Sequence, residues 1–239
     1  MHILQVTLWL YGTALTRSFQ WMRKNWLVSL APVVYGIGLT VVGTIVAPLG
    51  LIGGMLYSVA TQACASSALF LIKNMLDSGK TDVNDFLNGF TVYIWELITI
   101  GFILWIPMRL AAVGFASAAN GALLYFLFKL AIYIVLNAVP ELIYQSRTSG
   151  LELIGASYHF IVENWLEWLV PNVIFGVAGF YLLDVFESYL FALPGFMQLF
   201  FYALVLGVAL TAFMTFRGFL FAELHGTTQR SRLYRYNTR

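Results

Sequence analysis

Residues 18–32 read Ser-Phe-Gln-Trp-Met-Arg-Lys-Asn-Trp-Leu-Val-Ser-Leu-Ala-Pro, and residues 157–171 read Ser-Tyr-His-Phe-Ile-Val-Glu-Asn-Trp-Leu-Glu-Trp-Leu-Val-Pro. Six positions of the two stretches are identical, and they include Asn-Trp-Leu at 25–27 and at 164–166. In each copy an amphipathic segment ends at Asn-Trp and a long apolar run begins. The pattern therefore predicts, twice, a helix on a membrane surface that leads the chain into the bilayer.

The composition is that of an integral membrane protein. Of 239 residues, 60% are hydrophobic and only 10% are charged, whereas soluble domains are roughly half apolar and a quarter charged. Each crossing of a bilayer needs roughly 20 apolar residues, so the length allows about six crossings and no soluble catalytic domain. No cleavable signal peptide is expected, because the first charged residues follow the N-terminal apolar segment. The only cysteine, Cys64, excludes an internal disulfide.

We expect an all-α, polytopic membrane protein in which residues 1–239 form a single membrane domain. Its apolar runs are separated by turns rich in proline, glycine and polar residues. The expected segments, in order, are an amphipathic surface helix at 1–25, spans one and two at 26–76, a cytoplasmic connector at 77–91, spans three and four at 92–140, a second surface helix at 141–165, spans five and six at 166–222, and a basic cytoplasmic tail at 223–239.

Helical spacing of apolar residues carries the prediction of the two surface helices. The alternative for the first is a short seventh crossing from Ile3 to Leu15. Trp26 and Trp165 are candidate membrane anchors, and Asn25 and Asn164 are candidate helix caps. The apolar stripe of the first helix is Leu4, Leu8, Tyr11, Leu15, Phe19 and Met22, and that of the second is Leu151, Ile154, Tyr158, Ile161 and Trp165.

The likeness of the two copies extends weakly beyond Asn-Trp-Leu. Pro48-Leu49-Gly50 precedes span two and Leu193-Pro194-Gly195 precedes span six, and these two spans end near Gly79 and Gly226. The unit would be a surface helix, a span, a Pro/Gly turn and a span, repeated in parallel around spans three and four. A stripe of small and polar residues in span two predicts close helix packing, with a permeation path as the alternative. The stripe is Gly50, Gly54, Ser58, Gln62 and Ser66.

Lysine and arginine predict the orientation, because basic residues concentrate in cytoplasmic loops. Eleven of the thirteen lie on the side that holds both ends of the chain, and the opposite loops contain none. Both termini are therefore expected in the cytoplasm, with the spans in the cytoplasmic membrane of a bacterium. The eleven are Arg17, Arg23, Lys24, Lys73, Lys80, Arg147, Arg217, Arg230, Arg232, Arg235 and Arg239.

Charged residues inside spans are costly and are candidates for function. Lys129, near the middle of span four, needs a partner or a wet cavity, and Arg109, Asp184 and Glu187 could form one polar cluster with it. The functional hypothesis is a site for an anionic group, such as a lipid phosphate or an exported acid. The alternative is a buried ion pair that fixes the packing of spans three, four and five. Glu96 and Glu141 are expected to be interfacial residues without further purpose.

Motifs of catalysis are absent from the sequence. The histidines His2, His159 and His225 have no ligand-spaced neighbours, so no metal site is expected. The sequence has no phosphate-binding loop, nucleophile elbow or HExxH helix, so we expect no enzyme and no cofactor. In the tail, Arg230, Arg232 and Arg235 are expected to bind the anionic leaflet, at about 1 kcal/mol each. Nucleic acid is not expected, because the net charge is only +2.

The sequence resembles the membrane domain attached to some bacterial glycerophosphodiester phosphodiesterases, and stand-alone relatives of unknown role. The likeness lies in Pro140-Glu141 at the end of a span, then a polar connector, Ala156-Ser157 and Asn164-Trp165-Leu166 before the next span. The same elements occur in Ala14, Ser18 and Asn25-Trp26-Leu27. The resemblance covers most of the chain but includes no catalytic phosphodiesterase part, and it implies no catalytic residues.

A second resemblance is architectural, to the membrane subunit of an ABC exporter that works with a separate ATPase. An N-terminal surface helix, six spans and a polar amphipathic segment at 81–90 carry it. The second surface helix and the short loop between spans five and six depart from that family. The resemblance implies that the segment contacts the ATPase. The candidate contact residues are Asp82, Asp85, Phe86 and Phe90.

The sequence thus favours a permease-like or transport-accessory protein without its own ATPase, acting on a lipid or another anionic amphiphile. Its expected partners are membrane lipids and a separate ATPase or another membrane subunit. The alternative is a membrane scaffold that transports nothing and recruits a partner protein through its surface helices.

Overall fold

The structure is a computed structural model of the chain, and it describes residues 2–146, 148–191 and 193–238. Within these ranges the chain forms helices joined by short turns and contains no strand. The basic residues Arg147 and Arg239 lie outside the described residues. The elements are α1 (His2–Lys24), η1 (Trp26–Leu30), α2 (Ala31–Val46), η2 (Ala47–Leu49), α3 (Leu51–Asp77), α4 (Val83–Val92), α5 (Ile94–Ala116), α6 (Gly121–Val135), α7 (Val139–Gln145), α8 (Leu151–Leu190), α9 (Gly195–Leu224) and α10 (Gln229–Asn237).

Six helical segments are long and apolar enough to cross a membrane, which confirms the predicted multi-pass, all-helical fold. A helix satisfies its backbone hydrogen bonds internally, as a segment in hydrocarbon must. The six are Trp26–Leu49, Leu51–Asp77, Ile94–Ala116, Gly121–Gln145, Leu151–Leu190 and Gly195–Leu224.

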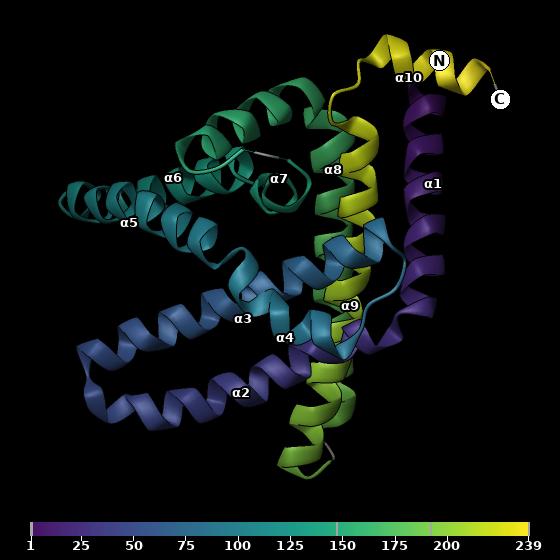
Figure 1. Cartoon of the computed structure of the whole chain (residues 1–239). Coiled ribbons are helices and arrows are strands. Elements are labelled where there is room, and N and C mark those ends of the chain that lie inside the picture. Colours follow the sequence, from purple (N-terminus) through teal and green to yellow (C-terminus); the bar gives the residue numbers. More distant parts are fainter. Residues whose placement is uncertain (1, 147, 192, 239) are drawn as a thin grey trace.

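The spans form three helical hairpins, α2–α3, α5–α6 and α8–α9, that diverge from one packed region (Figure 1). In Figure 1 the α8–α9 hairpin stands upright with α1 beside it, while the other two hairpins extend to the left. We call the packed region the hub. The hub is the set of almost fully buried side chains Leu10, Ser66, Met75, Glu141, Leu142, Leu153, Trp168, Thr215, Phe216, Leu220, Phe221 and Leu224.

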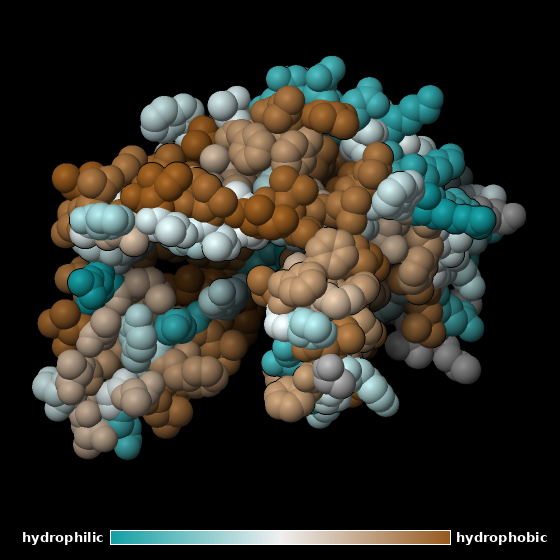
Figure 2. All heavy atoms as spheres, turned by 90° about the horizontal axis from the view of Figure 1, so that it is seen from below, coloured by the Kyte–Doolittle hydropathy of each residue, from teal (hydrophilic) through white to brown (hydrophobic). Residues whose placement is uncertain are grey.

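Outside the hub, the flanks of the hairpins remain exposed. Figure 2 shows that apolar side chains cover most of the face seen from below, and that hydrophilic residues gather toward the edge where Figure 1 places α1 and α10. In a membrane these flanks contact lipid or another membrane protein. Their exposure there has no hydrophobic cost, because the bilayer core contains no water. Examples are Ile45 and Leu51 on the first hairpin, Leu110 and Leu123 on the second, and Phe180 and Leu199 on the third.

Helix α1 packs lengthwise along α9 (Figure 1). Its buried face contains Val6, Leu10 and Ala14, and Ser18 Oγ donates a hydrogen bond of 3.3 Å to a carbonyl of α9. Of the predicted apolar stripe of the first surface helix, Leu8 and Phe19 are exposed, whereas Tyr11 packs against the core. Helix α1 thus has one face on the protein, and it exposes the apolar side chains Leu8, Leu15 and Phe19.

The second surface helix differs from its predicted bounds of 141–165. The chain leaves α6 at Val135, turns, and forms the short helix α7, which inserts Glu141 and Leu142 into the hub. Pro140 at the start of α7 favours this, because its fixed φ suits the first helical turn. The helix that leads into span five then begins at Leu151, after Gly150 with a φ of 60°.

The predicted basic tail at 223–239 is also ordered as helix in its described part. Helix α9 continues to Leu224, and after Gly226 the chain forms α10, which lies against the N-terminal half of α1. The Trp9 and Tyr236 rings lie 5.9 Å apart, so the two ends of the described chain come together, as Figure 1 shows.

Candidate functional site

The best-defined polar site is an ion pair buried in the hub, between Arg217 of α9 and Glu141 of α7. Arg217 Nε donates to Glu141 Oε1 at 2.8 Å, and Nη2 donates to Oε2 at 2.7 Å. Glu141 is 0% exposed. Arg217 Nη2 also donates to the main-chain carbonyl of Asn137. The two-point geometry is the strong form of an arginine–carboxylate contact.

Aromatic rings and amides enclose this pair. The Arg217 guanidinium lies 5.0 Å from the Trp168 ring and 5.3 Å from the Phe213 ring, which are cation–π distances. Asn137 Oδ1 accepts hydrogen bonds from Trp168 Nε1 at 2.9 Å and from Asn172 Nδ2 at 3.3 Å. The cluster therefore connects α7, α8, α9 and the turn before α7.

The arrangement is that of a structural link. Both carboxylate oxygens of Glu141 are occupied by Arg217, and the cation is covered by rings, so neither charge is offered to a substrate. A proton transfer would first have to break the pair. We therefore assign the cluster the task of joining hairpins at the hub.

A second polar feature recurs at both Asn-Trp positions. Asn25 has φ −118° and ψ 40°, and Asn164 has φ −128° and ψ 22°, so each interrupts a helix. Each Nδ2 donates to the carbonyl four residues earlier, that of Trp21 at 3.0 Å and that of Phe160 at 3.2 Å. Each asparagine thus holds a bend together by bonding back to the previous turn.

The other hydrogen bonds of each asparagine side chain join it to a segment that follows a later span, which is span two for Asn25 and span six for Asn164. Asn25 Oδ1 accepts from the backbone N–H of Thr81 at 3.1 Å, and Asn164 Oδ1 accepts from Arg232 Nη2 at 3.0 Å. In both places a glycine with a φ of 68°, Gly79 or Gly226, ends the preceding segment. A short helix with a capping box then begins, α4 in the first case and α10 in the second.

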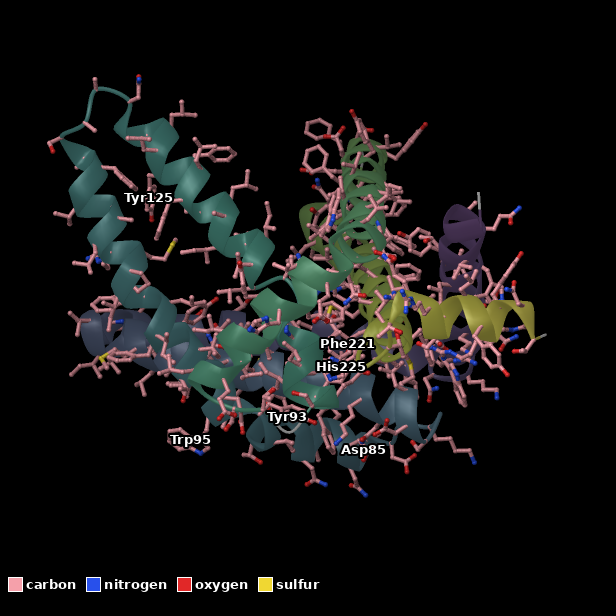
Figure 3. All side chains as sticks on the ribbon, turned by 90° about the horizontal axis from the view of Figure 1, so that it is seen from above. Asp85, Tyr93, Trp95, Tyr125, Phe221 and His225 are labelled. Atoms are coloured by element: carbon pink, nitrogen blue, oxygen red, sulfur yellow. The ribbon has the colours of Figure 1, made fainter. Side chains whose placement is uncertain are left out.

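The four predicted ligand-binding residues are not joined to one another. Lys129, Arg109, Asp184 and Glu187 are all exposed, and the ion pairs of the described residues are Arg17–Glu223, Arg217–Glu141 and Arg235–Glu223. Lys129 Nζ lies 5.5 Å from the centre of the Tyr125 ring. Figure 3 shows Tyr125 out on the α5–α6 hairpin, apart from Phe221 and His225 at the hub.

The predicted partner-contact residues on α4 lie in two environments. Asp82 and Asp85 form the capping box of the helix. Phe86 stacks on Tyr35 at 5.3 Å, and Phe90 meets both rings edge-on. The two phenylalanines therefore pack α4 against α2, and the exposed apolar residues of α4 include Val83 and Leu87.

Among the predicted membrane anchors, Trp26 and Trp165 are 61% and 59% exposed, and Arg230 is exposed as well. Arg235 is bonded to Glu223 at 3.0 Å. Arg232 differs from the prediction, because its side chain is buried between α1, α8 and α10 and is not available to a lipid surface around the protein.

Sequence reasoning missed Arg217, Glu141 and Asn137. The sequence pattern places Arg217 among the cytoplasmic basic residues and predicts that Glu141 is interfacial. The available signal was the cost of a charge in an apolar environment, because Arg217 lies among phenylalanines inside the last span. The two partners are 76 positions apart, so their spacing did not connect them.

Across the described ranges, no group of three or more His, Cys, Asp and Glu side chains lies close enough to hold a metal ion. No family model, no curated protein and no solved structure matches this chain. A function therefore has to be argued from the geometry.

Proposed function

We propose that this chain is a permease-like or transport-accessory protein of a bacterial cytoplasmic membrane, which handles an amphiphile and has no energy source of its own. Energy, where it is needed, would come from another chain, such as the separate ATPase that the likeness to exporter subunits implies. The localisation rests on the composition and on the asymmetry of the basic residues.

One observation supports an amphiphile above all, a hollow of about 310 Å³ at the base of the α5–α6 hairpin. Its lining is entirely apolar and includes Pro107 of α5, Phe128 and Ile132 of α6, and Ile154 of α8. Leu136 also lines it, and the next residue, Asn137, belongs to the polar cluster of the hub. An amphiphile needs an apolar space for its acyl chain and polar groups nearby for its head group.

Filling the hollow should slow the movement of lipid through the protein. In vesicles that contain the purified chain, we expect a fluorescent phospholipid to change leaflets at least about tenfold faster than in protein-free vesicles, which is a barrier lower by about 1.4 kcal/mol. Ile132→Trp should remove most of that acceleration, because the indole occupies the space of an acyl chain. Chemical bleaching of the outer-leaflet dye measures the rate.

The neighbouring residue provides the control. Tyr133 is 73% exposed and does not line the hollow, so Tyr133→Trp adds the same ring without filling the space and should leave the rate unchanged. Equal rates in wild type and Ile132→Trp would exclude the hollow as the route. Wild-type vesicles no faster than protein-free ones would overturn the permease-like function.

The second candidate is a scaffold that transports nothing and recruits a partner protein. The observation in its favour is the exposed apolar face of α4, formed by Val83 and Leu87 beside the acidic Asp82. The exposed α5 flank with Trp95 and Trp105 could serve a membrane partner in the same way. This candidate replaces the first if the vesicle experiment shows no movement of lipid.

We also propose that the chain contains a parallel internal repeat, α1 to α4 and α8 to α10, with both termini on the cytoplasmic side. The matching bends at Asn25 and Asn164, the left-handed glycines after the second spans and the capped helices α4 and α10 support it. The bends also support two cytoplasmic-face helices, α1 and the N-terminal part of α8, that meet the spans at Asn-Trp.

The repeat predicts that substitutions at both bends destabilise the chain. Asn25→Ala and Asn164→Ala both remove the bond to the previous turn. Asn25→Ala also removes three bonds to Gly79 and Thr81, and Asn164→Ala removes one bond to Arg232. Each should lower the free energy of unfolding by about 1–3 kcal/mol, because buried partners lose their hydrogen bonds. Asn120→Ala, at an exposed turn, is the control for the same exchange. Thermal unfolding in lipid nanodiscs measures all three, and a large cost at only one of the two bends would argue against the repeat.

A further inference from the structure

Helix α10 encloses a pocket of about 160 Å³ together with α1 and the start of the fifth span. Apolar side chains, Val6, Leu10 and Leu233, form much of its lining. Three charged side chains, Glu167, Arg230 and Arg232, line it as well. Two of the helices that line it, α1 and α10, carry the two ends of the described chain (Figure 1).

Arg232 is 3% exposed, yet most of its hydrogen-bonding capacity is unused. Nη2 donates to Asn164 Oδ1, whereas Nε and Nη1 have no partner among the described residues. Burial lowers the pKa of Arg232, and the charge of Glu167 raises it. A buried guanidinium with idle N–H groups is costly, because those groups have lost water without gaining a partner.

Glu167 is 5% exposed and lines the same pocket. It accepts one long hydrogen bond of 3.5 Å from Gln229 Nε2. It does not form a salt bridge with Arg232, although the two charges influence each other. The pocket thus holds a positive and a negative group apart instead of neutralising one with the other.

Packing alone does not require an arginine at this position. Phe86 is the fourth residue after the capping residue Asp82 of α4, and Arg232 is the fourth after the capping residue Thr228 of α10. Phe86 packs its helix through a ring stacked on Tyr35. The corresponding position of α10 carries a buried cation that lines a pocket and keeps two unpartnered N–H groups, which points to a ligand.

We propose that this pocket binds a zwitterionic head group of the phosphoethanolamine type, with its phosphate on Arg232 and its ammonium group on Glu167. The idle Nε–H and Nη1–H groups suit phosphate oxygens, and the exposed Arg230 at the rim adds positive charge. A purely anionic ligand would meet the uncompensated carboxylate of Glu167. The choice of a lipid source, phosphatidylethanolamine, rests on the proposed function, while the head-group chemistry does not.

Binding of short-chain lipids to the delipidated full-length protein tests this pocket. We expect phosphatidylethanolamine to bind at least about tenfold more tightly than phosphatidylglycerol, which lacks the ammonium group, or than phosphatidylcholine, whose ammonium has no N–H to donate. Glu167→Gln should abolish that preference while keeping an acceptor for Gln229. Arg232→Met should weaken all three lipids by about tenfold or more.

Arg23→Met is the matched control, because Arg23 is exposed, forms no ion pair among the described residues and does not line the pocket. The affinities of this variant should equal those of wild type. Since Arg232→Met also removes the bond to Asn164, the lipid preference of Glu167→Gln is the deciding measurement. Equal affinity of wild type for the three lipids, or an unchanged preference in Glu167→Gln, would overturn the inference.

Soluble phosphoethanolamine distinguishes the two sources of the head group. If it displaces the lipid at a similar concentration, the ligand is the free compound; if it does not, the acyl chains contribute and the lipid is the ligand. The outcome is independent of the vesicle experiment. If the chain prefers phosphatidylethanolamine but moves no lipid, the pocket is upheld and the permease-like function is overturned. If the chain moves lipid but shows no preference for phosphatidylethanolamine, the permease-like function is upheld and the pocket is overturned.

Discussion

An Arg217→Met variant is expected to lose about 3–5 kcal/mol of folding free energy, the usual cost of breaking a buried ion pair from one side. The loss arises because the carboxylate partner of Arg217 remains buried. Glu141 is fully buried and both of its oxygens are bonded to Arg217, so the substitution leaves a carboxylate without water or a cation. Asn137 loses a donor to its carbonyl at the same time.

Unfolding in lipid nanodiscs, followed by heat or by denaturant, measures the loss. The double variant Arg217→Met with Glu141→Leu should recover most of it, because exchanging both charges for apolar side chains is often neutral or stabilising. Arg109→Met is the matched control, since Arg109 is exposed and has no ion pair in the described chain. A single variant that loses less than about 1 kcal/mol, within the range of ordinary surface changes, would show that the pair does not hold the hub.

The sequence predicted the spans because length and apolarity are sufficient conditions for a membrane helix. The first span begins at Trp26 and the second at Leu51, as the sequence predicts. The bends at Asn25 and Asn164 also lie where the repeated motif predicted a boundary. Their mechanism differs from the predicted cap, because neither side chain caps the helix that follows, and each bonds back to the previous turn.

The hub was not predictable from pattern alone. Its central ion pair joins residues that are 76 positions apart. The sequence of helix α7 predicts the end of a span followed by a polar connector, and not a separate helix. Lys129 lies deep within a predicted span. Depth along a helix, however, does not determine which face of the helix has a neighbour. In the structure that face of α6 is exposed.

The same limit applies to helix packing. The stripe of small residues in span two predicted close contact, yet a Cβ added at Gly54 would meet nothing within 4 Å, and Ser58 is exposed. Along the stripe, burial begins at Gln62, which is half-buried, and is complete at Ser66. A small-residue stripe shows that close approach is possible, while the partner helix decides where it occurs.

A close backbone approach between two spans is expected to make Gly207→Ala strongly destabilising. A Cβ at Gly207 of α9 would lie 2.2 Å from the Ser29 carbonyl oxygen and 3.5 Å from Pro32 Cδ. The first of these is a backbone atom, so the segment that leads into α2 has to move away from α9. Overpacking of this kind costs about 1–3 kcal/mol, and we expect a value near the upper end because Pro32 stiffens the same segment.

The control for this exchange is Gly54→Ala, also inside a span helix but with open space around the new methyl group. It should leave stability unchanged or slightly higher, since alanine is the better helix former by about 1 kcal/mol in a helix interior. A difference between the two variants in the unfolding experiment isolates the contact from the general effect of replacing glycine. If Gly207→Ala is as stable as Gly54→Ala, then α9 and the first Asn-Trp segment are not in contact, and the placement of α2–α3 on the hub has to be revised.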